Sequence, residues 1–135
     1  MARPHIEPFC DRDVHWKNMA LPGMGKGFSY KMLSMDNETG ACSMTVQMEG
    51  GYKRAPGFSW SEYEMLVVEG SFTIAGKRYA KGHYFYVPAG YALGELATEQ
   101  GAKVLMMYNT SEPSHIESDE HHALANVGLY HDISS

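Results

Sequence analysis

The stretch from Pro56 to Gly94, PGFSWSEYEMLVVEGSFTIAGKRYAKGHYFYVPAGYALG, decides the fold that the sequence predicts. It contains two apolar runs, Met65 to Val68 and Tyr84 to Val87, and each run ends at a turn signal. A hairpin-like segment around Ala75 and Gly76 lies between them. Short strands separated by glycine-bearing turns in this rhythm are typical of a small antiparallel barrel.

The flanking sequence extends the strand pattern on both sides. Residues 28–35 and 41–48 read as strands, and the turn cluster at 36–40 between them predicts an antiparallel hairpin. Residues 102–108 form the last strong strand, and helical periodicity is absent before residue 110. We therefore expect an all-β architecture, a single antiparallel barrel of the jelly-roll type.

The barrel is expected to occupy residues 28–110, with an N-terminal arm over 1–27 and a polar tail over 111–135. In the tail, Ser114 and Glu117 stand at capping-box spacing, which would suit a short helix. The tail histidines, His115, His121, His122 and His131, match no metal signature, so an exposed polar tail is favoured.

Composition limits the classes of function. The 135 residues suit one domain, and the net charge of −5 with eleven scattered Lys and Arg residues argues against a nucleic-acid-binding surface. No apolar run approaches the roughly 18 residues that span a bilayer. The N-terminus lacks the apolar core of a secretory signal, so a cytoplasmic protein is expected. Cys10 and Cys42 show no paired motif, and two reduced thiols are favoured.

Two spacings in this chain match the motifs of the cupin superfamily. The first motif runs from a glycine through His-any-His, three or four residues and a glutamate to a glycine five or six residues later; Glu64 and Gly70 supply its second half. The second runs from a glycine over five residues to a proline and over four more to a histidine. Gly82, Pro88 and Leu93 stand at those positions.

Within that superfamily of double-stranded β-helix (RmlC-like) barrels, residues 5 to 112 resemble the ChrR-like cupins. This group includes the sensory domain of an anti-sigma factor, dioxygenase-like proteins and single barrels. The resemblance is carried by Trp16, the turn ETGA at 38–41, EYEMLVVEG at 62–70 and GHYFYVPAG at 82–90. A local second resemblance is to the ethanolamine-utilisation Q proteins, which also lack the histidine set and keep acidic residues before a VLEG-like turn.

The resemblance implies a metal bound by three histidines and a glutamate, but most of those ligands are replaced. Counting from Glu64 and Pro88 puts Gly57, Ser59 and Leu93 where the histidines would stand. Glycine and leucine offer no lone pair, and a serine hydroxyl is a poor ligand for a transition metal. We expect the usual cupin metal to be absent or its site to be rebuilt, so no cofactor is assigned and no residue is predicted to bind metal.

Three carboxylates are candidates for chemistry inside the barrel. Glu64 is predicted to point inward with Leu66 and Val68, where it would bind a cation or a cation-bearing ligand, hydrogen-bond a hydroxyl or have a raised pKa. The alternative is a structural glutamate that is satisfied by a neighbouring Tyr or Arg. Glu62 would share its face or lie in water at the mouth. Glu95 follows Leu93 at strand alternation and could face Glu64 across the cavity, unless a bulge reverses the register.

The other candidate ligand-binding residues surround the expected pocket. Arg54 lies where the chain enters the barrel, and a cation at the mouth would suit a carboxylate or phosphate, although a surface role remains open. The aromatic residues could line a pocket for a planar ligand, and the alternative for each of them is packing in the core. The full ligand-binding set is Glu62, Glu64, Arg54, Ser59, Trp60, Tyr86, Leu93 and Tyr108.

Two classes of function remain open at this stage. The first is a small-molecule-binding barrel without the histidine-based metal centre, whose ligand is oriented by an inward carboxylate. The second is an enzyme, either a lyase or isomerase that uses Glu64, Glu95 and tyrosines as acid and base, or a metal enzyme with a rebuilt site. Cupins pair through sheet edges and terminal arms, so the resemblance also implies a homodimer.

Overall fold

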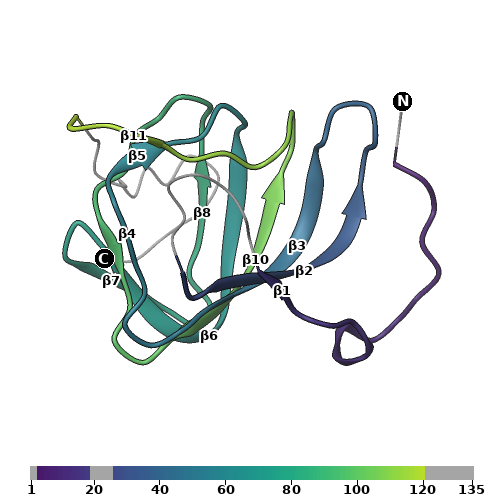
Figure 1. Cartoon of the computed structure of the whole chain (residues 1–135), viewed down its shortest axis with the longest axis horizontal. Coiled ribbons are helices and arrows are strands. Elements are labelled where there is room, and N and C mark those ends of the chain that lie inside the picture. Colours follow the sequence, from purple (N-terminus) through teal and green to yellow (C-terminus); the bar gives the residue numbers. More distant parts are fainter. Residues whose placement is uncertain (1–2, 19–25, 121–135) are drawn as a thin grey trace, which may run out of the picture.

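The computed structural model describes residues 3–18 and 26–120, which form a curled antiparallel sheet. After a 3-10 turn at Asp11–Asp13, the strands are β1 (Lys17–Asn18), β2 (Phe28–Met35), β3 (Cys42–Met48), β4 (Lys53–Arg54), β5 (Gly57–Phe58), β6 (Tyr63–Ile74), β7 (Lys77–Ala80), β8 (Tyr84–Val87), β9 (Leu96–Ala97), β10 (Ala102–Tyr108) and β11 (Ile116–Glu117). The main sheet has the order β1-β2-β3-β10-β6-β9-β4, and β7 and β8 also pair with β6. Strands β5 and β11 form a separate pair (Figure 1).

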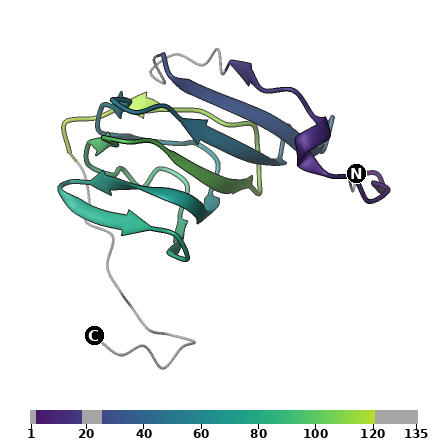
Figure 2. The same cartoon turned by 90° about the horizontal axis from the view of Figure 1, so that it is seen from below.

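The predicted all-β barrel architecture is confirmed, and so are its main turns. Strands β2 and β3 pair as the expected hairpin around residues 36–40, with Phe28 opposite Met48. The turn between β6 and β7 places Ala75 and Gly76 at φ 52° and 83°, the backbone that a tight two-residue hairpin requires. In Figure 2 the strands follow one another across the sheet from β1 through β2, β3 and β10 to β6.

Strand β6 links the two halves of the curled sheet. Its first half pairs with β10 and β8, and its second half pairs with β7 and β9. The β6–β10 register shifts at Val68, which has no partner, and Gly70 adopts a φ of 75° beside the bulge. A bulge of this kind bends the strand, and it turns Val68 outward to 40% exposure. The prediction that Val68 points inward was therefore wrong.

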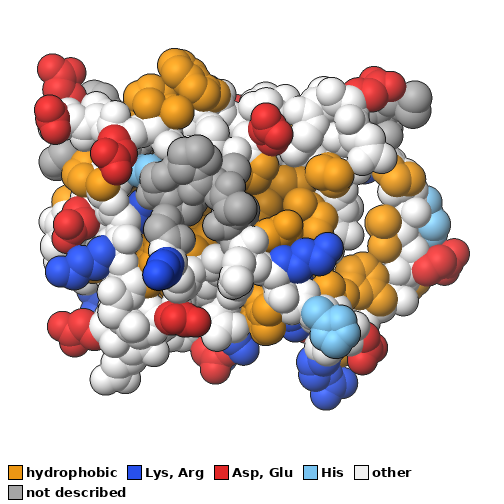
Figure 3. All heavy atoms as spheres, in the orientation of Figure 1, with side chains coloured by type: hydrophobic (Ala, Val, Ile, Leu, Met, Phe, Trp, Pro, Cys, Tyr) orange, Lys and Arg blue, Asp and Glu red, His pale blue; other side chains and the backbone are white. Residues whose placement is uncertain are grey.

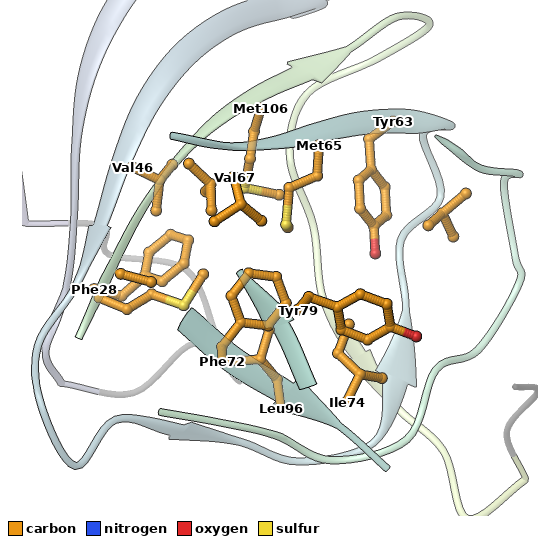
Figure 4. Close-up of a cluster of buried hydrophobic side chains, with 14 of the residues drawn as sticks. Phe28, Val46, Tyr63, Met65, Val67, Phe72, Ile74, Tyr79, Leu96 and Met106 are labelled. Atoms are coloured by element: carbon orange, nitrogen blue, oxygen red, sulfur yellow. The ribbon is translucent and has the colours of Figure 1, made fainter. Parts of the chain in front are cut away.

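The core fills the inside of this curl. Figure 4 shows Tyr63, Met65 and Val67 extending from the same side of β6 toward Phe72, Ile74 and Tyr79 on the far wall. Four methionines, at positions 44, 48, 65 and 106, are almost fully buried and fill the core. Cys42 is buried in β3, whereas Cys10 is exposed, and both are free thiols. Among the described residues, no helix is long and apolar enough to cross a membrane.

The expectations for the first tail residues were wrong. Instead of a helix, Ile116–Glu117 forms β11, which pairs with β5 so that Ile116 lies opposite Phe58. His115 is 7% exposed, because its ring packs over the bare α-carbon of Gly57 and its Nε2–H donates to the Ala55 carbonyl at 2.9 Å. His121, His122 and His131 lie outside the described residues.

Candidate functional site

Strand alternation at the start of β6 decides which side chains face the interior. Tyr63, Met65 and Val67 are buried, and Glu64 and Leu66 lie on the opposite, outer face. The prediction that Glu64 and Leu66 point inward was wrong by one residue. The cupin motif also allows three residues between its second histidine and its glutamate, and six between the glutamate and the glycine. Counted in this way from Ser59 and Gly70, the glutamate position is 63, which is a tyrosine.

Glu64 is instead part of a hydrogen-bonded group on the outer face. Its two carboxylate oxygens accept hydrogen bonds from the Tyr84 hydroxyl of β8 at 2.7 Å and from Asn109 Nδ2 at 2.9 Å. These two hydrogen bonds hold the pKa of Glu64 below its ordinary value. Burial and the neighbouring carboxylate together raise the pKa of Tyr84 to about 12. At neutral pH this pair is an ionised carboxylate and a protonated phenol.

Four further predicted site residues also lie outside the core. The Tyr86 hydroxyl donates to Glu62 on the outer face, and this hydrogen bond raises the pKa of Tyr86. Trp60 is 63% exposed and packs edge-on against Phe58. Glu95 is exposed, because the irregular segment between Leu93 and β9 breaks the alternation, so Glu64 and Glu95 do not face each other.

Four buried polar side chains lie close enough to Arg54 for its charge to act on them. We call the set an interior polar cluster: Tyr52, Arg54, Tyr63, Tyr108 and His115. All five side chains are buried, and Arg54, predicted at the mouth, is only 5% exposed. Its guanidinium is hydrogen-bonded to the Tyr63 hydroxyl. Tyr63 stacks on Tyr108, with 5.2 Å between the ring centroids.

Electrostatics in the interior polar cluster leave Arg54 as its only charge at neutral pH. Burial raises the pKa of Tyr52 and Tyr63, although the positive charge of Arg54 acts in the opposite direction on both. Burial also raises the pKa of Tyr108 far above its ordinary value. Burial and Arg54 together lower the pKa of His115 to about 4. The cluster thus combines one cation, neutral phenols and a neutral imidazole.

The residues at the four cupin ligand positions, Gly57, Ser59, Tyr63 and Leu93, do not fit a metal. Gly57 has no side chain, and a Cβ there would press against the Ile116 carbonyl and lie 2.8 Å from His115 Cε1. The Ser59 hydroxyl hydrogen-bonds with Ser114 Oγ at 3.2 Å, and Leu93 is a buried apolar residue. No group of three or more His, Cys, Asp or Glu side chains within 3–18 and 26–120 is arranged to hold a metal ion.

The surface of the described residues offers hollows. One, between residues 55–56 and 117–119, lies beside the interior polar cluster, since Ala55 follows Arg54 and accepts the His115 hydrogen bond. Two others contain no residue of the cluster. One lies between residues 47–50, 69–70 and 100–103, where Lys103 and Glu69 already pair at 3.4 Å. Another lies between arm residues 6–11 and the side chains of Leu33 and Thr45. On the face in Figure 3 the Lys and Arg side chains are dispersed, as the sequence predicted.

Sequence reasoning found part of this interior polar cluster and missed the rest. Arg54 and Tyr108, which were predicted to bind a ligand, belong to the cluster, and Ser59 and Leu93, which were predicted with them, are also buried. Tyr63 was missed because the motif was read with four residues, the longer of the two allowed spacings, between the second histidine position and the glutamate. His115 was missed because a lone histidine in a polar tail carries no local signal of burial.

The fold and these motif positions define the class as a cupin barrel. The family model described as "ChrR Cupin-like domain" matches residues 10–112, so the chain belongs to the ChrR cupin-like family. No curated protein matches the chain.

Solved structures with low sequence identity share the fold. A candidate dioxygenase from Nostoc punctiforme has a TM-score of 0.75 at 21% identity; the match covers 84% of this chain and 42% of that chain. The polyketide cyclase RemF from Streptomyces resistomycificus has a TM-score of 0.68 at 17% identity, covering 86% of this chain and 89% of that one. The Rhodobacter sphaeroides SigE complex with the anti-sigma ChrR matches with a TM-score of 0.57 at 17% identity over 73% of this chain and 51% of that chain.

Proposed function

We propose that this protein is a small-molecule-binding cupin barrel that works without the histidine-based metal centre of its fold. The observation that carries the proposal is the replacement of all four ligand positions by Gly57, Ser59, Tyr63 and Leu93. The first of these positions is also filled by β11 and His115. The barrel keeps a buried polar cluster, and convergent polar groups inside an apolar wall are the usual composition of a ligand site.

The proposed orienting group differs from the one that the sequence predicted. An inward carboxylate was expected, but Glu64 lies on the outer face and both of its oxygens are engaged. We do not propose the alternative, an acid–base enzyme that uses Glu64 and Glu95, because both carboxylates lie outside the barrel interior. Arg54 and the neutral phenols of Tyr63 and Tyr108 are the polar groups that the interior supplies.

Elemental analysis and ligand screening together test this function. Untagged protein is incubated with Mn²⁺, Fe²⁺ or Zn²⁺, desalted and analysed, and we expect far less than one metal ion per chain. A thermal-shift screen of small acids, phenols and sugars should find at least one class that stabilises the protein, since a ligand at about 100 times its Kd adds roughly 2.7 kcal/mol. Stoichiometric metal, or the absence of any stabilising compound, would overturn the proposal.

Two tyrosines provide a matched control for where the ligand binds. Tyr63→Phe and Tyr84→Phe each remove one hydroxyl, the first from the interior polar cluster and the second from the outer face. A ligand inside the barrel should lose affinity in the Tyr63→Phe variant and keep it in the Tyr84→Phe variant. The reverse pattern would place the binding site on the outer face and would contradict the proposal.

A further inference from the structure

Arg54 is a buried cation without a counter-ion among the described residues. Its side chain is 5% exposed, and the ion pairs found in the described part of the chain join other residues. An arginine stays protonated in proteins, and placing an unpaired charge in a protein interior costs several kcal/mol. Folded proteins therefore pair such a charge, and the described part of this barrel offers no carboxylate for it.

One edge of the Arg54 guanidinium has no hydrogen-bond acceptor. Its Nε–H is fully buried and without a partner, whereas the guanidinium is hydrogen-bonded to the Tyr63 hydroxyl. The Nε edge is one of those through which arginine binds a carboxylate with two parallel hydrogen bonds. A buried donor without a partner lowers the free energy of unfolding by about 1–3 kcal/mol, and a bound acceptor would remove this cost.

The neighbours of Arg54 can donate hydrogen bonds to an anion but cannot replace one. Tyr63 and Tyr108 are protonated phenols at neutral pH, because burial raises the pKa of each. His115 is neutral and uses its Nε2–H on the Ala55 carbonyl. The interior polar cluster therefore carries a net positive charge and phenolic O–H groups.

We propose that Arg54 is the centre of an anion-binding site inside the barrel and that its ligand is a small monocarboxylate with an apolar body. The inference rests on the proposed function and names the chemical class of its ligand. A single guanidinium balances a single negative charge, and the apolar walls of the barrel interior would not solvate a second one. An apolar body suits the same walls.

Calorimetric titration of the full chain with sodium benzoate tests the inference, with benzamide and sodium chloride as comparisons. Benzoate should bind, and benzamide, which has the same shape without the charge, should bind at least about ten times more weakly, because hydrogen bonds to charged groups are the stronger ones. Chloride binding with no response to benzoate would show a site for inorganic anions only and would overturn the carboxylate assignment.

Strand β4 supplies a matched pair of variants. Arg54→Met removes the buried cation and Lys53→Met removes the exposed cation beside it. We expect benzoate affinity to fall about 10- to 100-fold in Arg54→Met and to stay within about twofold in Lys53→Met. Without ligand, Arg54→Met should fold with equal or higher thermal stability, since replacing a buried ionic group by an apolar one of similar volume is often stabilising.

The outcomes separate this inference from the proposed function. If neutral phenols or sugars bind and carboxylates do not, the anion site is wrong and the metal-free binding barrel stands. If benzoate binds equally well to wild type and to Arg54→Met, Arg54 is not its anchor and the inference is wrong. If Arg54→Met is strongly destabilised without ligand and wild type does not bind benzoate, Arg54 has a structural role instead.

Discussion

Glu64 shows how a single residue on the outer face is satisfied without reaching the interior. Tyr84 belongs to β8 and Asn109 directly follows β10, the strands on either side of the first half of β6, and each donates to one oxygen of the carboxylate. The carboxylate therefore joins three strands on a solvent-facing surface. Such a contact orders side chains locally, but its energy is screened by water.

The Glu64→Gln variant should therefore be only slightly less stable than wild type at pH 7, by less than about 1 kcal/mol. Because the folded-state pKa of Glu64 lies below the unfolded value near 4.5, this contribution is present above that pH and is lost as the pH falls through the folded pKa. Urea unfolding at pH 7 and pH 3 should show the difference shrinking. A loss of several kcal/mol at pH 7 would mean that Glu64 lies in the core.

Strands β5 and β11 form the element that closes one end of the barrel. Their pairing brings Glu117 opposite Gly57 and seats the His115 ring against the glycine. The residue in this position must lack a side chain, because the space of its Cβ is taken by the Ile116 carbonyl. The pairing of β11 with β5 therefore requires a glycine at position 57 and leaves no room for a family histidine there.

Gly57→Ala should destabilise the protein by about 1–3 kcal/mol, the usual cost of overpacking, because the methyl group would push β11 away from β5. Ser59→Ala is the matched control, since it removes a hydroxyl that hydrogen-bonds with Ser114 and adds no volume; its cost should be near 1 kcal/mol. Chemical unfolding of both variants gives the comparison. A Gly57→Ala variant within about 0.5 kcal/mol of wild type would contradict the packing of β11 at this point.

At the scale of the elements, the sequence predicted the strands that turn residues delimit. The ends of β2, β8 and β10 agree with prediction because Gly, Pro and Asn-rich turns mark them locally. The face of β6 could not be fixed in the same way, since Tyr63 and Glu64 differ by one step and both faces carry apolar residues. Strand β11 has two residues and pairs with β5, which is distant in the sequence, so no local pattern predicts it.

The distribution of charge over the whole molecule is uneven. The net charge is −5, and carboxylates such as Glu62, Glu64 and Glu95 lie outside the core, while Arg54 lies inside it. His115 is buried next to that cation, and burial and the cation both disfavour its protonation. Acid should therefore act on the stability of the whole fold through this histidine.

The unfolding free energy should decline as the pH falls from about 6.5 to about 4. His115 has a folded-state pKa of about 4 and an ordinary value of 6.5, so in this window the unfolded chain binds a proton that the folded chain does not. The loss from this group is at most about 3 kcal/mol, and it is absent above pH 6.5. His115→Gln, which keeps an N–H for the Ala55 carbonyl, should flatten the dependence.

The Arg54→Met variant adds a second, independent measurement of the same effect. Without the neighbouring cation the pKa of His115 should rise toward its ordinary value, so the pH dependence of stability should become shallower while His115 is still present. Urea unfolding of wild type and both variants at half-unit steps from pH 7.5 to 4 gives the three slopes. Equal slopes in wild type and His115→Gln would show that other groups cause the acid sensitivity, and a slope changed by His115→Gln but not by Arg54→Met would leave burial as its only cause.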